Sequence, residues 1–211
     1  KAPPARAPHD LLRGILEGEA AAQGEVWDSY APLLRGVLRR SLGPWADVED
    51  ALQDVFLTFF RVASTLRDPE ALRPFLIGIA MRVARGELRK RRVRRWLFLT
   101  DDGTLPEPAQ TDGDGDAREA VRRLYAILDK LDSESRLAFV LRHIEGLELE
   151  EVARSLDLSL ATTKRRLAKV MPVVQARVRA DELLSRYAEA TGAAEPRPLF
   201  GRHLASEEGG R

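Results

Sequence analysis

Eight basic side chains fall within fourteen residues, between Arg82 and Arg95, and a single acid lies among them. On a helix, four of the arginines share one face and the other basic residues widen it: first Arg82, Arg85, Arg89 and Arg92, then Lys90, Arg91, Arg94 and Arg95. Such dense like charges repel one another, whereas phosphates would supply anions and release condensed counterions on binding. The spacing predicts a helix that binds nucleic acid. The alternatives are a solvated charged face, or a basic helix that lies on a membrane surface or a protein partner.

A second basic segment, residues 143–170, has the pattern of a helix-turn-helix. Its apolar residues are spaced to close the interior of a short helix, a tight turn and a second helix: Val152, Ala153, Leu156, Leu158 and Leu167. Residues 160–179 carry six basic side chains and no acid, which suits a DNA groove and its flanking phosphates. The second helix is expected to expose Thr162, Lys164, Arg165, Arg166 and Lys169. An ordinary helical hairpin with a charged face is the alternative.

Helices are expected to position both segments, because helical periodicity recurs along the chain and strand-like alternation is absent. The sequence therefore predicts an all-α protein. A helix-rich stretch is expected at 25–42, interrupted by Pro32, and Pro172 is expected to end or kink a later helix. The remaining predicted helices span residues 47–63, about 74–96, 120–131, 133–144, 150–156, 160–171 and 174–190.

The charge distribution divides the chain into two helical domains. Residues 1–99 carry 17 basic and 12 acidic side chains, whereas residues 100–117 carry no basic side chain and 6 acidic ones. This Gly-, Pro- and Asp-rich segment has little apolar surface to bury, so it is predicted to be a flexible acidic linker. The expected organisation is a disordered tail (1–9), a first domain (10–99), the linker (100–117), a helix-turn-helix domain (118–172), and a C-terminal helix and tail (173–211).

Several function classes are excluded by composition. The chain has no cysteine, which rules out disulfides and thiolate metal sites, and its three histidines are too scattered for metal-ligand spacing. No run of about 18 apolar residues indicates a membrane-spanning helix. We find no P-loop, nucleophile elbow or dinucleotide-binding glycine loop. The sequence thus predicts a cytoplasmic protein that is not an enzyme, needs no cofactor or metal, and does not insert into membranes.

In this order, these segments resemble a bacterial RNA polymerase sigma factor of the extracytoplasmic-function (ECF) group of the sigma-70 family. The resemblance covers about residues 10–172. Residues 47–60 (DVEDALQDVFLTFF) resemble the family's polymerase-clamp helix, and residues 75–95 resemble the helix that engages the promoter −10 element. Residues 128–170 resemble the domain that reads the −35 element.

The resemblance implies partners and site residues. It implies two domains like sigma regions 2 and 4, which contact the β′ clamp helices and β flap of core RNA polymerase, promoter DNA, and an anti-sigma factor as a further candidate partner. On the helix at 47–60, the implied polymerase-binding residues are Glu49, Asp50, Gln53, Asp54 and Phe56. The eight basic residues from Arg82 to Arg95 are the implied contacts to the −10 element, called the −10 set. The implied contacts to the −35 element, called the −35 set, are Arg136, Thr162, Thr163, Lys164, Arg165, Arg166 and Lys169. The loop at 64–73 is the candidate cradle for an extruded base.

Departures from the family pattern leave promoter melting open. Phe75, Arg82 and Gly86 stand where the family usually has Trp, Asn and Asp, and Thr163 stands at a usual Val. Arg82 can only donate hydrogen bonds, whereas Asn both donates and accepts. The alternatives are therefore a sigma-like protein without independent melting, a stand-alone helix-turn-helix regulator, or an interaction protein whose basic helix binds an acidic partner.

Overall fold

The structure, a computed structural model, describes residues 6–44, 46–97 and 115–190, and every regular element in these ranges is helical. The chain divides into two compact units, Lys1–Thr104 and Leu105–Arg211. This agrees with the predicted all-α fold in two domains. In the described ranges, no helix is long and apolar enough to cross a lipid bilayer.

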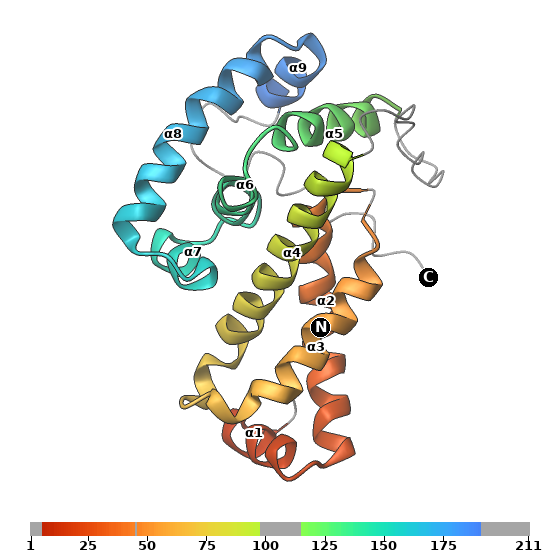
Figure 1. The fold of residues 1–211 in the computed structure, drawn as a ribbon, viewed down its shortest axis with the longest axis vertical. Coiled ribbons are helices and arrows are strands. Elements are labelled where there is room, and N and C mark those ends of the chain that lie inside the picture. The colour runs from red at the N-terminus through yellow and green to blue at the C-terminus, as the bar shows by residue number, and fades with distance from the viewer. Residues whose placement is uncertain (1–5, 45, 98–114, 191–211) are drawn as a thin grey trace. The chain divides into compact units, whose positions relative to one another are not determined.

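The first unit packs three long helices side by side, and a short helix crosses one end of them (Figure 1). Its helices are α1 (Pro8–Leu16), α2 (Ala20–Leu42), α3 (Val48–Val62) and α4 (Leu72–Leu97), with the 3₁₀ turns η1 (Ala63–Thr65) and η2 (Pro69–Ala71) between α3 and α4. The helical spacing of apolar residues builds a common core from all four helices. Its fully buried members include Leu11, Leu34, Leu38, Leu52, Phe59, Leu76 and Ile79.

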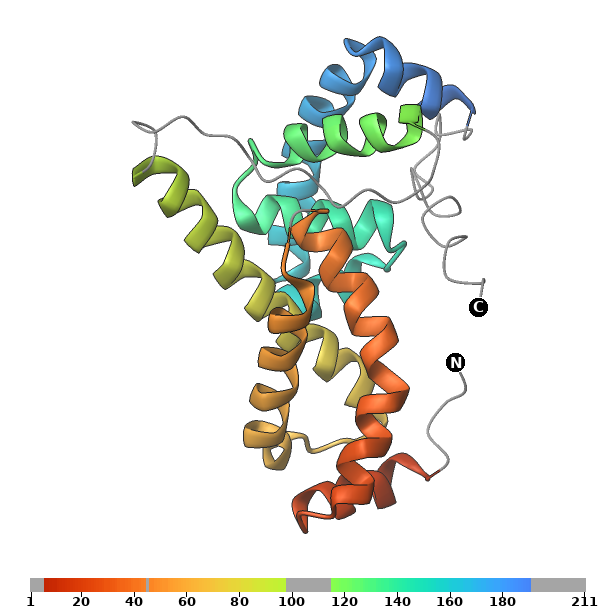
Figure 2. The same cartoon turned by 90° about the vertical axis from the view of Figure 1, so that its right-hand side faces the viewer.

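The second unit places α6 in contact with both helices of the helix-turn-helix, the second of which is long (Figure 2). Its elements are α5 (Gly115–Leu128), α6 (Ser133–Phe139), the π-helical turn η3 (Val140–Ile144), α7 (Leu149–Leu156), α8 (Leu160–Arg179) and α9 (Glu182–Ala190). The core lies around α6, where five successive residues, Leu137–Leu141, are fully buried.

The helix-turn-helix is built by local capping. A capping box between Glu148 and Glu151 begins α7, and Asp157 ends it in the left-handed conformation, at φ 55°. Ser159 then caps α8, since its Oγ accepts a hydrogen bond from the amide of Thr162 at 3.1 Å. The tight turn predicted between the two helices therefore lies at residues 157–159, where Asp157 ends one helix and Ser159 caps the next.

Both proline expectations are wrong in part, because α2 and α8 continue through Pro32 and Pro172. A proline inside a helix removes one backbone hydrogen bond and usually breaks the helix. Here both rings are exposed. The apolar neighbours on the inner face, Leu34 and Val174, are at most 1 % exposed, so their burial holds the helix together across each proline.

The residues at which the two domains begin also differ from the expectation. Residues 1–5 of the tail predicted at 1–9 lie outside the described residues. The amide of Arg6 donates to Glu25 at 2.8 Å, and α1 begins at Pro8, where a proline suits the first helical turn. Residues 115–117, predicted as linker, begin α5. The rest of the predicted linker, residues 100–114, and the tail at 191–211 lie outside the described residues.

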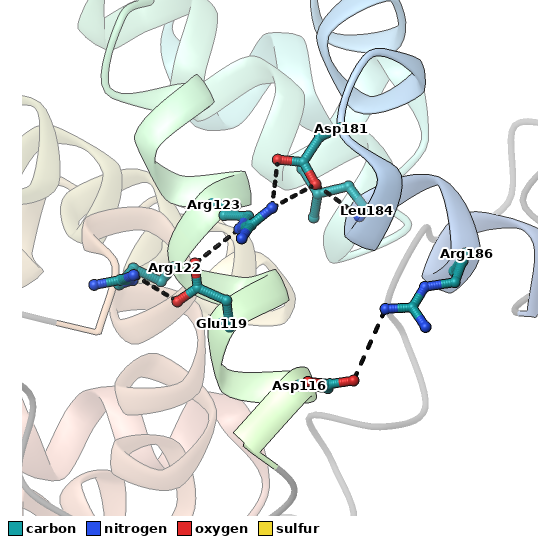
Figure 3. A network of polar contacts seen from close by, with 7 residues as sticks. All are labelled: Asp116, Glu119, Arg122, Arg123, Asp181, Leu184 and Arg186. Carbon is teal, nitrogen blue, oxygen red and sulfur yellow. Dashed lines mark hydrogen bonds and ion pairs between the residues drawn. The ribbon is translucent and has the colours of Figure 1, made fainter.

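The helix predicted at 174–190 is formed by the end of α8 and by α9, which folds back on α5 (Figure 3). Asp181 caps α9 through the amide of Leu184 at 3.1 Å and accepts Arg123 of α5 at 3.1 and 3.2 Å. The Leu184 amide and then Arg123 lower the pKa of Asp181. Leu184 itself is fully buried, so this extension belongs to the folded second unit.

Candidate polymerase and nucleic-acid interfaces

Most of the predicted basic residues in the described part of α4 are exposed. These are Arg82, Arg89, Lys90 and Arg92, while apolar residues such as Leu76 and Ile79 turn into the core. The helix itself is continuous to Leu97, but the side chains of the predicted residues Arg94 and Arg95 lie outside the described ones.

Some basic residues of α4 are partly engaged within the protein. Arg85 is only half-exposed, and Lys90 pairs with Glu87 at 2.7 Å. Arg91 donates from Nη1 to the carbonyl of Leu42 at 3.1 Å, which ties α4 to the end of α2. A charge pattern predicts the pair with Glu87, three residues away on the same helix, but not the contact with Leu42, which lies far away in the sequence.

The acidic face of α3 follows its predicted residues only in part. Asp50, Gln53 and Asp54 are exposed on one side of the helix. Glu49 accepts two hydrogen bonds from Arg35 of α2, at 2.7 and 3.0 Å, and these lower the pKa of Glu49.

Phe56 was expected to bind polymerase, but it is a core residue. It is 2 % exposed, and its ring packs on Trp27 of α2 with 4.5 Å between ring centroids. The exposed apolar residues beside the acidic face are instead Trp27, at 38 %, and Leu57, at 52 %. Sequence reasoning missed both, although Leu57 continues the helical spacing of Asp50 and Asp54.

The outer face of α8 exposes three of its predicted basic residues, Lys164, Arg165 and Lys169. Thr162 is half-buried, and its hydroxyl accepts a hydrogen bond from Ser159 at 2.8 Å. These residues lie on the first three helical turns after the cap of α8, and it is the N-terminal part of a recognition helix that reaches DNA bases.

Two residues of the expected −35 set, Thr163 and Arg136, are buried inside the second unit. Thr163 is fully buried, and its hydroxyl donates back to the carbonyl of Ser159 at 3.1 Å. Arg136 is 2 % exposed; it forms an ion pair with Asp129, and its guanidinium lies 5.5 Å from the ring centre of Tyr125. Because a buried charge must be paired, Arg136 is committed to the core of the second unit.

Arg166 was also expected on the outer face, but it turns inward against α6. Its Nη1 lies 3.0 Å from Asp132, and its Nη2 lies 2.7 Å from Glu134. One signal was available in the sequence, since Arg166 lies three residues after Thr163 and one before Leu167, both of which face the core.

In the described ranges, no group of three or more His, Asp or Glu residues could hold a metal ion.

Known proteins share both units. A family model for sigma-70 region 2 matches residues 26–94, and one for sigma-70 region 4 matches residues 121–171. The chain is 32 % identical to the ferric citrate uptake sigma factor FecI of Escherichia coli strain K12, over 144 residues that cover 65 % of this chain and 80 % of FecI. It belongs to the ECF group of the sigma-70 family.

Further ECF-group and sigma-factor relatives cover most of the chain. RNA polymerase sigma factor CnrH of Cupriavidus metallidurans is 31 % identical over 189 residues, 84 % of this chain and 97 % of CnrH. The ECF RNA polymerase sigma factor SigX of Bacillus subtilis is 29 % identical over 159 residues, 69 % of this chain and 79 % of SigX. The solved complex of CnrH with the cytosolic domain of CnrY has the same fold, with a TM-score of 0.59 and 24 % identity over 84 % of this chain and all of CnrH.

The family matches contain the charged faces described above. The region 2 match contains the acidic face of α3 and the basic residues of α4 up to Arg94, and the region 4 match contains the helix-turn-helix and the outer face of α8. The second half of α8 and all of α9 lie beyond it. Sigma factors are DNA-binding regulators that direct transcription initiation at promoters, and this is the function of the chain.

Proposed function

We propose that this sigma factor binds core RNA polymerase through the acidic face of α3, and promoter DNA through α4 and α8. The observation that carries the proposal is the separation of charge: Asp50 and Asp54 are exposed on α3 beside Gln53, whereas the exposed charged residues in the described parts of α4 and α8 are all basic. Basic side chains suit phosphates and guanine edges. An acidic face with Trp27 and Leu57 beside it suits a protein partner that offers cations and an apolar contact.

In this proposal α4 holds the −10 element and the outer face of α8 reads the −35 element. The loop 64–73 cradles an extruded base, and its exposed polar residues include Ser64, Thr65 and Arg67. Extruding a base costs a few kcal/mol of stacking and pairing, which contacts to that base offset. The β flap of the polymerase contacts the second unit, and the chain itself catalyses no reaction.

The partners give the proposal a location and a regulator. Because core polymerase and promoters are in the bacterial cytoplasm, the sigma factor acts there. Solved relatives carry bound proteins: CnrH with the cytosolic domain of CnrY, and a sigma factor RpoE with the anti-sigma factor NepR from Bartonella quintana. We propose an anti-sigma factor as a further partner of this chain.

Run-off transcription with purified core polymerase on linear promoter DNA tests the whole proposal. Specific initiation supports it. Polymerase binding without open complexes would indicate a sigma-like protein that does not melt promoters, and DNA binding without polymerase affinity would indicate a stand-alone regulator. A chain with neither activity would be an interaction protein.

The outer face of α8 is tested separately with Arg165→Ala. If Arg165 reads a −35 base, the variant should lose about 1–3 kcal/mol of discrimination between the cognate and a substituted −35 element. Arg179→Ala is the matched control, since Arg179 is exposed at the far end of the same helix. Binding titrations with both DNAs measure the discrimination, and an unchanged ratio for Arg165→Ala would reject its assignment.

A further inference from the structure

Arg166 joins α8 to the start of α6 through two carboxylates. Its Nη1 lies 3.0 Å from Asp132 Oδ1 and 3.4 Å from Ser135 Oγ, and its Nη2 lies 2.7 Å from Glu134 Oε2. The four residues are named the α6–α8 clasp. A guanidinium that spreads over two carboxylates fixes both the distance and the direction of the contact, which a single point charge does not.

Asp132 serves both helices of the clasp at once. The same Oδ1 that accepts Arg166 also accepts the amide of Ser135 at 2.9 Å, which caps the N-terminus of α6. Burial raises the pKa of Asp132, but the hydrogen bonds from Ser135 and the charge of Arg166 outweigh this and lower it. The carboxylate is therefore ionised at neutral pH, where the clasp needs it.

The charge balance of the clasp argues against a direct contact between Arg166 and DNA. One guanidinium faces two carboxylates, so the cluster carries a net charge of −1. If Arg166 swung out to a phosphate, Asp132 and Glu134 would lose their shared cation next to a polyanion. The side chain is also only 25 % exposed.

The clasp lies on the same turns of α8 as the residues proposed to read DNA. Lys164 and Arg165 come just before Arg166 in the sequence and Lys169 comes three residues after it, and all three are exposed on the outer face of α8. Small displacements matter here, because a bidentate pair with a base needs donors in a fixed geometry. The rotation and tilt of α8 on α6 therefore determine whether these side chains reach bases.

We propose that Arg166 is a positioning residue, which acts on promoter selectivity through Glu134 and Asp132 and not by touching DNA. The proposal rests on the proposed −35 role of α8. Its consequence is that two acids on another helix sustain the affinity of a DNA-binding surface, although acids by themselves repel DNA.

The test compares Glu134→Gln, Arg166→Gln and the double variant in full-length protein, by titration with −35 DNA and with a scrambled duplex. We expect each single variant to weaken −35 binding about tenfold, and the double variant to lose little more than either single one, because the two changes break the same contact. Binding to the scrambled duplex should stay unchanged or tighten for Glu134→Gln, which removes an acid.

Matched controls are Glu182→Gln on α9 and Arg179→Gln on α8, both exposed residues outside the clasp. Circular dichroism at the assay temperature identifies variants that are fully folded, so that a loss of selectivity is not a loss of folding. If Arg166→Gln is unfolded, Arg166→Lys replaces it: the lysine keeps the charge but cannot bridge two carboxylates, and it should also lose selectivity.

The opposite result has a clear form. If Arg166→Gln weakens −35 binding while Glu134→Gln leaves it unchanged or tightens it, Arg166 contacts DNA directly and the proposal is overturned. Additive losses in the double variant would also overturn it. Failure of the proposed −35 role itself is seen separately, since the wild-type protein would then bind both duplexes equally.

Discussion

His143 is a buried imidazole in the core of the second unit. It is 6 % exposed, its ring lies 5.0 Å from that of Phe139, and its Nε2 has no hydrogen-bond partner in the described part of the chain. Burial, with a smaller effect of the Arg142 charge, lowers the pKa of His143 from 6.5 to about 4. The folded protein therefore holds this side chain neutral at a pH where the unfolded chain protonates it.

The sign of the pH effect follows from that difference. Between pH 6.5 and about 4 the unfolded state binds more protons, so the stability that neutral His143 contributes is complete above pH 6.5 and is lost as the pH falls to 4. At about 1.4 kcal/mol per pKa unit, the loss is roughly 3 kcal/mol. Urea unfolding should show a weaker pH dependence in His143→Leu than in wild type. Equal slopes in this pH range would contradict the assignment.

At the scale of residues, sequence reasoning could identify candidates but not their partners. Lys164, Arg165 and Lys169 are exposed as the composition of the helix predicts. Arg166 and Arg136 carry the same charge, yet acids brought close by the fold neutralise them. A helical pattern shows which side chains share a face, but pairing across helices depends on tertiary packing, which no local pattern contains.

At the scale of elements, apolar periodicity predicted most helices within a few residues. It missed α1 (Pro8–Leu16) altogether, and it failed where two effects compete, at Pro32 and Pro172. Local propensity favours a helix end at either proline, whereas burial of the flanking apolar side chains favours one continuous helix. Single-sequence reasoning cannot decide between the two, because the burial depends on neighbouring helices, such as α3 and α4 for α2, and α5 and α6 for α8.

The continuous α8 makes Pro172 a testable defect. Its ring is exposed, and the residue removes the backbone hydrogen bond to Ala168. Pro172→Ala should restore that bond and raise the free energy of unfolding of the second unit by about 1–3 kcal/mol, measured by chemical denaturation. Pro69→Ala is the control and should give no such gain, since Pro69 begins η2, where a proline is tolerated. A less stable Pro172→Ala would mean that packing requires the proline geometry.

At the scale of the whole molecule, the near-neutral net charge of +1 conceals faces of opposite sign. The acidic face of α3 and the basic faces of α4 and α8 belong to separate helices, so one chain can offer different partners opposite charges. The block charges of the sequence indicated two basic domains and an acidic linker, but not the acidic face of α3, which lies inside the first basic block. They could not indicate which cations remain exposed, because that depends on contacts such as Arg91 to Leu42.

Salt dependence measures how many of these cations meet phosphates. Each phosphate contact contributes about −0.9 to the slope of log K against log salt concentration on duplex DNA. If Arg89 of α4 contacts a phosphate, Arg89→Gln should make the slope less negative by about 1, and the variant should lose a similar amount of affinity for unrelated DNA sequences. Arg13→Gln on α1 is the control, since Arg13 pairs with Asp10 at 2.9 Å. Equal slopes for wild type and Arg89→Gln would remove Arg89 from the interface.

The C-terminal extension has a practical consequence for anyone trimming the protein. The region 4 match stops at residue 171, whereas the folded unit continues to Ala190, with Val174, Leu183 and Leu184 in its interior. A fragment that ends at residue 171 would lack α9, so the apolar residues of α5 that α9 covers would be exposed to solvent and would promote aggregation. The natural place to shorten this sigma factor is after α9.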